Sequence, residues 1–311
     1  MARIRVAVIG LGKIAGDQHL PAIGKSDAFD LVGVVDPRGG PAPVPAFADA
    51  AALYGALDVD AVAICTPPHV RYALAREALA AGKHVLLEKP PAATLAEMHD
   101  LEAAARVAGR TVFAAWHSRY NGAVEAAKAR LKGQRLKRLA VEWKEDVRKW
   151  HPGQDWVWDA GNFGVFDPGI NALSILTEIA PAALFVKAAT LHYPENRDTP
   201  IAASLTLASA EAAPGAMLLA EFDWRQQGEQ SWNIDIATEG GTTLRLTHGG
   251  SRLFVIGAAA IDAPRREYEA IYARFADLVR GRESEMDARP FQLVGDAFLV
   301  GARRTAAAFD W

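Results

Sequence analysis

The glycine-containing segment Gly10-Leu-Gly12-Lys-Ile-Ala15 is the feature that most limits how this chain can fold. It follows the apolar run Arg5–Gly10 and precedes a segment of helical character, so it predicts a tight strand–turn–helix connection. Gly10 allows the turn, Gly12 allows close approach to the backbone, and Ala15 allows a helix to pack closely on the strand. A glycine turn without a ligand is the alternative, and the segment alone leaves both interpretations open.

Short apolar runs and helical segments alternate through the first 120 residues. The predicted strands are Arg5–Gly10, Phe29–Asp36, Ala61–Cys65, His84–Leu87 and Thr111–Ala115. Helices are expected between them, as at Val70–Ala81 and after Thr94, where Thr94 and Glu97 suit a capping box. This alternation predicts βαβ units, and therefore an α/β Rossmann domain with a parallel sheet over residues 1–120.

Beyond residue 120 the pattern changes. Helices are predicted up to about Lys132 and near Ile170–Ile179, and Gly240-Gly241 is expected to form a turn. The predicted strands are Leu184–Tyr193, Ala216–Trp224, Trp232–Thr238, Thr243–Thr247 and Leu253–Ile256. We therefore expect an α+β domain with a mainly antiparallel, open sheet over 121–288, serving substrate binding and oligomerisation.

Two helices are expected near the end of the chain. They are Glu267–Val279 and Phe291–Phe309. The second, at about 289–309, could pack back on the first domain.

An acidic residue ends the second predicted strand. Asp36 can accept hydrogen bonds from ribose hydroxyls, and its charge would repel a 2′-phosphate, which favours NAD. Arg38 could contact a 2′-phosphate, so NADP stays open, and a solvated loop arginine is the alternative. Thr66 and Pro67 follow the third strand at its carboxyl end and are expected on the nicotinamide side. The full set expected to bind the cofactor is Gly10, Gly12, Lys13, Ile14, Asp36, Arg38, Thr66, Pro67, Glu88 and Lys89.

Charge and cysteine content limit the partners. The chain has 37 acidic and 34 basic residues, interleaved, with a net charge of -3, which offers no broad positive field for nucleic acid or anionic membranes. Small molecules are the expected partners. Cys65 is the only cysteine, so an intramolecular disulfide is excluded and a reducing compartment fits. No apolar run approaches the roughly 20 residues of a membrane span, and we expect a cytoplasmic protein. No cysteine, histidine and carboxylate spacing suggests a metal site.

A second motif follows the fourth predicted strand. In Glu88-Lys89-Pro90-Pro91 the lysine can hold a hydroxyl oxygen or transfer a proton, although a surface lysine in a proline-rich loop is the simpler alternative. The Rossmann glycines, this Glu-Lys-Pro motif and the β-rich second domain together resemble the Gfo/Idh/MocA oxidoreductases. The resemblance implies that Lys89 is catalytic.

A longer tract is more specific. Trp143–Gln154 and Val165–Leu173 resemble the bacterial D-galactose and L-arabinose 1-dehydrogenases of that family, and the similarity spans essentially the whole chain. It implies an NAD(P)-dependent aldose 1-dehydrogenase that oxidises D-galactose or L-arabinose, or D-fucose, at C1 to the lactone. It also implies a homo-oligomer, expected to be a dimer. The alternatives are a family member acting on an inositol or another aldose, and a non-catalytic dinucleotide-binding regulator.

Asp167 and Asn171 lie four residues apart and are expected on one helix face. Asp167 before a proline also suits a helix N-cap. The resemblance implies instead that both residues lie beside the C1 hydroxyl of the sugar. Because an amide cannot act as a general base at neutral pH, the proton acceptor is Asp167 or Lys89. We favour Asp167, with Lys89 holding the oxygen and Asn171 fixing the orientation.

The resemblance also implies further sugar contacts. These are His117, Glu145, Trp150 and Trp232. Aromatic faces can cover the C–H surface of a pyranose, and carboxylates and imidazoles can bind its hydroxyls. The alternatives are a solvated strand face for the glutamate and the hydrophobic core for the tryptophans. Asn162 lies within Gly161-Asn-Phe-Gly164, where the relatives tend to have paired glycines, a departure that concerns the local loop shape and not the chemistry.

Overall fold

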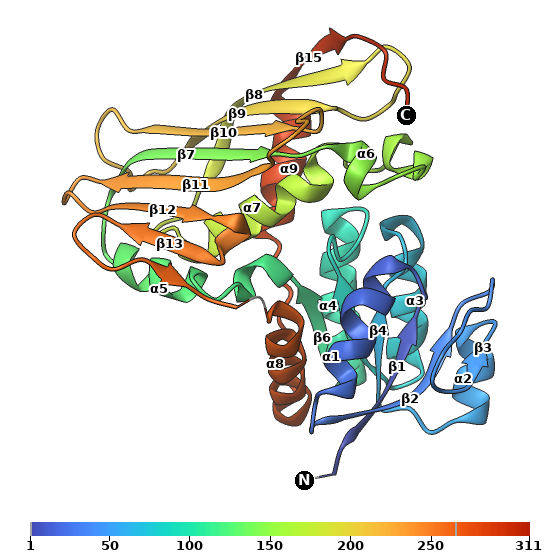
Figure 1. Cartoon of the computed structure of the whole chain (residues 1–311). Helices are drawn as coiled ribbons and strands as arrows, with labels where there is room; N and C mark the ends of the chain where they lie inside the picture. Colours follow the sequence, from blue (N-terminus) through green and yellow to red (C-terminus); the bar gives the residue numbers. More distant parts are fainter. Residues whose placement is uncertain (1, 265) are drawn as a thin grey trace. The chain divides into compact units, whose positions relative to one another are not determined.

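The chain folds into two compact units in a computed structural model that describes residues 2–264 and 266–311 (Figure 1). The first unit contains residues up to His117 together with Arg266–Ala288. The second unit contains the described residues from Ser118 to 264 together with Arg289–Trp311.

The first unit is built on a six-stranded parallel sheet with the order β3-β2-β1-β4-β5-β6. The strands are β1 (Ile4–Ile9), β2 (Phe29–Val35), β3 (Ala46–Phe47), β4 (Ala61–Ile64), β5 (His84–Glu88) and β6 (Val112–Ala115). The strand order reverses next to β1, so the carboxyl ends of β1 and β4 flank the point at which such sheets bind ligands. This arrangement confirms the predicted Rossmann fold class.

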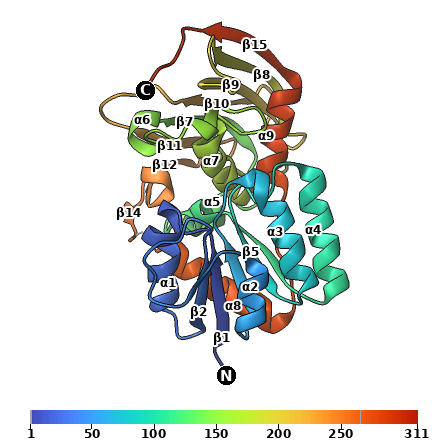
Figure 2. The same ribbon diagram turned by 90° about the vertical axis from the view of Figure 1, so that its right-hand side faces the viewer.

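Helices cover both faces of this sheet. They are η1 (Ala15–His19, a π-helix), α1 (Leu20–Gly24), α2 (Ala50–Ala56), α3 (Pro68–Ala80), α4 (Leu95–Ala108) and α8 (Glu267–Gly281). Alternate strand residues pack with α2, α3 and α4 in one core, and α3 and α4 lie side by side (Figure 2). On α8, Phe275 stacks against Phe29 of β2 and Phe113 of β6. The predicted cap at Thr94 is confirmed, because Glu97 N donates to Thr94 Oγ1.

The second unit contains a nine-stranded sheet with the order β14-β13-β12-β11-β7-β10-β9-β8-β15. The strands are β7 (Leu136–Lys144), β8 (Phe185–Pro194), β9 (Ala202–Ala208), β10 (Met217–Asp223), β11 (Ser231–Thr238), β12 (Thr243–Thr247), β13 (Arg252–Val255), β14 (Ile261–Asp262) and β15 (Gly301–Ala306). Among the described strand pairs of this second sheet, only β7–β10 and β8–β15 are parallel, which confirms a mainly antiparallel sheet. The turn after β11 contains Gly241 at φ +88°.

Helices cover one face of the large sheet (Figure 1). The helical segments are α5 (Val124–Leu131), α6 (Val147–Trp150), η3 (Asp155–Trp158), α7 (Phe166–Ile179), η4 (His248–Gly250) and α9 (Arg289–Val300), and η2 (His117–Tyr120) begins at the unit boundary. Strand residues alternate between buried and exposed, as expected for a sheet covered on one side. The exposed side carries Phe185, Met217, Leu219 and Phe254.

Two predictions about the end of the chain are wrong. Residues 266–288 lie in the first unit, because the aromatic face of α8 packs on the parallel sheet, whereas residues from Arg289 lie in the second. The expected helix over 289–309 ends at Val300, and Gly301–Ala306 pairs with β8 as an edge strand. A side chain at Gly301 would lie 2.4 Å from Ala297 O, so the close helix-to-strand junction requires glycine.

Candidate active site

The glycine turn has the geometry that the sequence predicts. Gly10 has φ +93°, and a Cβ there would lie 3.0 Å from Thr66 Cγ2, so both the conformation and the space require glycine. A Cβ on Gly12 would have no non-neighbouring atom within 4 Å among the described residues, so its backbone is open to a ligand. Ala15 is fully buried against the strand. Packing therefore explains Gly10 and Ala15 but not Gly12, whose backbone is open in the way that close approach of a ligand requires.

Asp36 lies at the end of β2 beside this turn. Its carboxylate accepts hydrogen bonds from Leu11 N at 2.9 Å and from Arg38 N at 2.9 Å, and the Arg38 guanidinium pairs with it at 3.2 Å. Hydrogen bonds from Arg38, and then the one from Leu11 N, lower the pKa of Asp36 to about 2. The carboxylate is therefore ionised at neutral pH, which makes it a strong acceptor for ribose hydroxyls.

The other expected cofactor residues lie around the same edge of the sheet. Lys13 is exposed and pairs with Asp17, and Ile14 is half-buried. Pro67 is exposed at the start of α3. The Thr66 hydroxyl is buried and has no hydrogen-bond partner among the residues that the structure describes. An orphaned hydroxyl beside an open glycine backbone and an ionised carboxylate fits a dinucleotide.

The Lys89 backbone is fixed by a buried carboxylate. Lys89 follows β5, is half-buried, and donates its backbone N–H to Glu88 Oε2 at 3.0 Å. Glu88 Oε1 accepts from Tyr268 at 2.7 Å and lies 2.9 Å from His19 Nε2. His19 Nδ1 lies 2.8 Å from the Tyr272 hydroxyl. The glutamate predicted to bind cofactor thus has its carboxylate engaged by protein groups.

Within this buried network the pKa shifts of His19 and Glu88 favour their charged forms, whereas those of Tyr268 and Tyr272 favour the neutral phenols. Burial alone would raise the pKa of Glu88, but hydrogen bonding and positive charge from His19 lower it to about 2. Burial would likewise lower the pKa of His19, but Cys65, Tyr272 and Glu88 around the ring raise it well above the usual value. We regard the Glu88 carboxylate at 2.9 Å as the main cause, because a protonated imidazole is its natural partner. His117 stacks on Tyr268 with the ring centroids 5.7 Å apart, so this expected sugar contact lies with the first unit.

Three neighbouring strands of the second unit bring its candidate residues to one edge. Glu145 follows β7, Trp224 follows the parallel strand β10, and Trp232 begins the antiparallel strand β11. Glu145 N donates to Asp223 O at 2.9 Å, and Trp232 Nε1 donates to Glu145 Oε2 at 2.9 Å. Glu145 is therefore buried, and the alternative of a solvated strand face is wrong.

Asp167 lies in the first turn of α7, opposite a histidine. The helix begins at Phe166 after an N-cap at Val165, so Asp167 is not the N-cap that its proline neighbour suggested. Asp167 Oδ2 lies 3.3 Å from His151 Nε2. Gly169 lets this end of α7 approach β10, because a Cβ there would lie 2.8 Å from the Phe222 ring.

The Glu145 carboxyl belongs to the same group of charges. Its burial raises its pKa above the usual value, opposed by the hydrogen bond from Trp232 and by His151, while Asp167 raises it further. Two carboxyl groups and one imidazole therefore interact in the second unit, an arrangement that binds or moves protons.

Trp150 and Asn171 complete the predicted set. Trp150 is 41% exposed, lies edge-on to Trp232 with the ring centroids 5.7 Å apart, and donates Nε1 to Gln230 Oε1 at 3.3 Å. Asn171 is half-buried one turn after Asp167. The structure thus brings Glu145, Trp232 and Trp150 into contact with one another and places Asp167 against His151, a residue that was not predicted. Asn162 lies beside Gly164, where a Cβ would lie 2.4 Å from Pro200 O.

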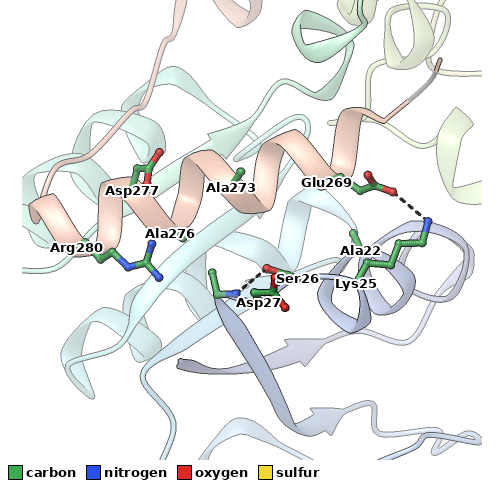
Figure 3. A pocket seen from close by; sticks show the side chains of 10 residues that line it. Ala22, Lys25, Ser26, Asp27, Glu269, Ala273, Ala276, Asp277 and Arg280 are labelled. Carbon is green, nitrogen blue, oxygen red and sulfur yellow. Dashed lines mark hydrogen bonds and ion pairs between the residues drawn. The ribbon is translucent and has the colours of Figure 1, made fainter. Parts of the chain in front are cut away.

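A separate surface pocket between α1 and α8 does not belong to this chemistry (Figure 3). Its lining includes the ion pair Lys25–Glu269 at 3.0 Å, and Ser26 and Ala28 place it at the amino end of β2. Parallel sheets bind ligands at the opposite, carboxyl end. In 2–264 and 266–311, no group of three or more His, Cys, Asp or Glu is arranged to hold a metal ion. Over the same residues, no helix has both the length and the apolar character needed to cross a membrane.

The doubly wound sheet, the open glycine turn and the ionised Asp36 define a dinucleotide-binding protein with a Rossmann domain. Residues 4–116 match the family model described as "Oxidoreductase family, NAD-binding Rossmann fold". The chain is 44% identical to galactose 1-dehydrogenase of Pseudomonas fluorescens, over 99% of each chain.

Solved structures show the same similarity. A crystal structure of D-galactose-1-dehydrogenase from Rhizobium etli matches with a TM-score of 0.94 and 48% identity, over 100% of this chain and 99% of the other. A 3-ketoreductase from Actinomadura kijaniata, with 20% identity and a TM-score of 0.79 over 98% and 100% of the two chains, shares the fold. The chain belongs to the Gfo/Idh/MocA family of oxidoreductases. The predicted family, enzyme class and NAD(P) cofactor class are confirmed.

Proposed function

We propose that this enzyme oxidises D-galactose, and the related pyranoses L-arabinose and D-fucose, at C1 to the lactone. The observation that carries the proposal is the similarity to two galactose 1-dehydrogenases over 99% or more of the chain. It is supported by the cluster of Glu145, Trp150 and Trp232, which offers a carboxyl group and aromatic faces for a pyranose.

The proposed chemistry removes the C1 hydroxyl proton and a hydride from C1. When bound, NAD(P) supplies the hydride acceptor. Asp167 accepts the hydroxyl proton, and His151 holds the Asp167 carboxylate in one orientation. Lys89 holds the C1 oxygen, and Asn171 fixes the orientation of the sugar. Glu145 and His117 bind further hydroxyls.

Cofactor contacts follow from the same proposal. Gly12, Lys13 and Ile14 approach the pyrophosphate at the start of the helix, Asp36 binds the adenosine ribose, and Arg38 accommodates the 2′-phosphate of NADP. Thr66 and Pro67 line the nicotinamide side, where the orphaned Thr66 hydroxyl finds a partner.

The test is the initial rate of NADH formation with D-galactose, L-arabinose, D-fucose and D-glucose, run in parallel with NADP. D-glucose differs from D-galactose only at C4, so it is the matched control for sugar configuration. We expect activity on the first three sugars and a loss of about 100- to 10,000-fold in Lys89→Ala. A preference for D-glucose would contradict the proposal.

Two further arms separate the alternatives. Turnover of an inositol but of no aldose would identify another specificity within the family. Binding of NADH, seen by fluorescence, without turnover of any sugar would favour a regulator.

We also propose that the open sheet face of the second unit joins two copies of the chain. Phe185, Met217, Leu219 and Phe254 are exposed on it, and exposed apolar residues on one face are typical of an interface. Sedimentation at micromolar concentration should give a dimer or a multiple of it, whereas a monomer alone would remove this proposal.

A further inference from the structure

Arg71 is a buried arginine that none of the proposed chemistry uses. It lies in the first turn of α3 and is 3% exposed. Its Nη1 donates to Glu88 O at 2.6 Å and also to Pro90 O, and its Nη2 donates to Thr66 O.

The three acceptors belong to two loops. Thr66 lies in the loop after β4, and its hydroxyl is expected to meet the cofactor. Glu88 is the last residue of β5 and Pro90 lies in the loop that follows, so the two flank Lys89. A planar guanidinium donates in several fixed directions at once, which an ammonium group cannot do with the same precision. Arg71 therefore ties together the two loops that carry the nicotinamide-side threonine and the proposed catalytic lysine.

Three hydrogen bonds consequently hold the backbone around Lys89. Lys89 N–H donates to the Glu88 carboxylate, and the carbonyl oxygens of the two neighbouring residues, Glu88 and Pro90, both accept from Arg71. Pro90 and Pro91 are buried and cannot rotate about φ. A lysine side chain that must reach one oxygen atom needs a backbone fixed in this way, because a displacement of about 1 Å costs on the order of 100-fold in rate.

We propose that Arg71 is a positioning residue that sets the placement of Lys89 and Thr66 through the backbone of their loops. The proposal rests on the proposed function, in which Lys89 contacts the C1 oxygen.

The test compares Arg71→Met, which keeps the length and loses every donor, with Arg71→Lys, which keeps the charge and loses the planar fork. Arg76→Met is the matched control, because Arg76 lies on the same helix but is half-exposed and pairs with Asp100. We expect R71M to lower kcat per NADH-binding site by about 10- to 100-fold, R71K to recover part of this loss, and R76M to resemble the parent enzyme. NADH affinity, measured by fluorescence, should also fall in R71M because Thr66 moves.

Dividing the rate by the number of NADH-binding sites separates a positioning role of Arg71 from a purely structural one. A purely structural role would lower the melting temperature and the number of binding sites, and would leave kcat per site unchanged. That outcome would overturn the proposal. If R71M does not fold, the same comparison made with R71K decides, because a fully active R71K would also overturn it.

A double substitution tests whether Arg71 acts through Lys89. In a Lys89→Ala background, R71M should change the residual kcat by less than about 3-fold, because the group that it positions is gone. Independent, multiplying losses would contradict action through Lys89. If K89A alone retains full activity, the role of Lys89 in the proposed function fails, and the NADH affinity of R71M then still decides whether Arg71 positions Thr66.

Discussion

His151 Nε2 lies 3.3 Å from Asp167 Oδ2, and the two side chains are only 17% and 13% exposed. The pair links the end of α6 to the first turn of α7, and His151 also packs on the Trp224 ring at 5.4 Å between centroids. An imidazole held in this way fixes the rotamer of the carboxylate and supplies a partner for its charge. The proton acceptor proposed for the reaction is therefore one half of a dyad.

Substituting His151 should impair catalysis more than binding. We expect His151→Ala to lower kcat by about 10- to 100-fold, because Asp167 loses the group that orients it. His99→Ala is the control, since His99 is exposed on α4. Initial rates over a range of galactose concentrations give kcat and KM separately, and a change in KM alone would assign His151 to binding instead.

The fold of the first unit was largely accessible from the sequence, because most strands of its parallel sheet are continuous apolar runs. In the second unit, β7 and β9 were not predicted, since β7 alternates apolar with charged residues. The five predicted strands of the first unit agree with β1, β2, β4, β5 and β6 to within one residue at each end, while β3, with two residues after a Gly/Pro-rich loop, carries no such signal. The predicted last helix is too long, because Gly301–Ala306 directly follows an amphipathic helix and forms a strand only through pairing with β8.

The site was accessible only in part. Glu145 lies in a Lys-Glu-Asp-Val-Arg run that looks solvated, and its burial arises from tertiary contacts with Trp232 and Asp223. His151 follows Trp150 directly in the tract that carried the resemblance, but pairing with Asp167 across 16 residues has no local signature. Arg71 could not be found, because its acceptors are backbone carbonyls, which every residue has.

The raised pKa of Glu145 predicts that removing its charge stabilises the fold but weakens sugar binding. A glutamate whose folded-state pKa is raised destabilises the fold above its unfolded pKa, near 4.5, and the cost disappears as pH falls through the folded value. Glu145→Gln should therefore raise the melting temperature by about 2–4 °C at pH 7.5 and show little change in acid. The KM for galactose should rise.

Glu142→Gln provides the control, because Glu142 is exposed on β7, three residues before Glu145. Calorimetry between pH 4.5 and 8 gives the melting temperatures of the parent and both variants, and initial rates give their KM for galactose. A melting temperature that falls equally at every pH would show that the carboxylate is a net stabiliser.

The buried His19–Glu88 pair predicts a loss of stability at alkaline pH. Because the folded-state pKa of His19 is raised, its protonated form stabilises the fold fully below about pH 6.5, and this contribution is lost as pH rises through the folded value. His19→Gln should cost about 3–5 kcal/mol at pH 6 and less at higher pH. Urea unfolding between pH 6 and 9 measures the free energy of unfolding, with His99→Gln as the control. If the free energy of unfolding of H19Q depends on pH in the same way as that of the parent, the pair is not charged.

Asp36 and Arg38 should control the choice of cofactor in opposite directions. Asp36→Ala removes an ionised hydrogen-bond acceptor, so kcat/KM for NAD should fall by about 10- to 100-fold while NADP is affected less. Arg38→Ala should lower kcat/KM for NADP and spare NAD. Initial rates with each cofactor at saturating galactose test this. Equal losses of kcat/KM for NAD and NADP in both variants would mean that Asp36 and Arg38 only stabilise the loop and do not select the cofactor.

Gly12 separates the demands of the cofactor from those of packing. In the part of the chain that the structure describes, a Cβ at Gly12 has no non-neighbouring atom within 4 Å, and its φ lies outside the left-handed region, so Gly12→Ala should fold with an unchanged melting temperature. If the backbone here approaches the pyrophosphate, the added methyl group should weaken NADH binding by about 10-fold or more. Gly16→Ala, equally free of neighbours on the following helical turn, is the matched control and should bind normally. Gly10→Ala should instead lose stability, because of its φ of +93° and its contact with Thr66. Normal NADH affinity in G12A would place the pyrophosphate elsewhere on the chain.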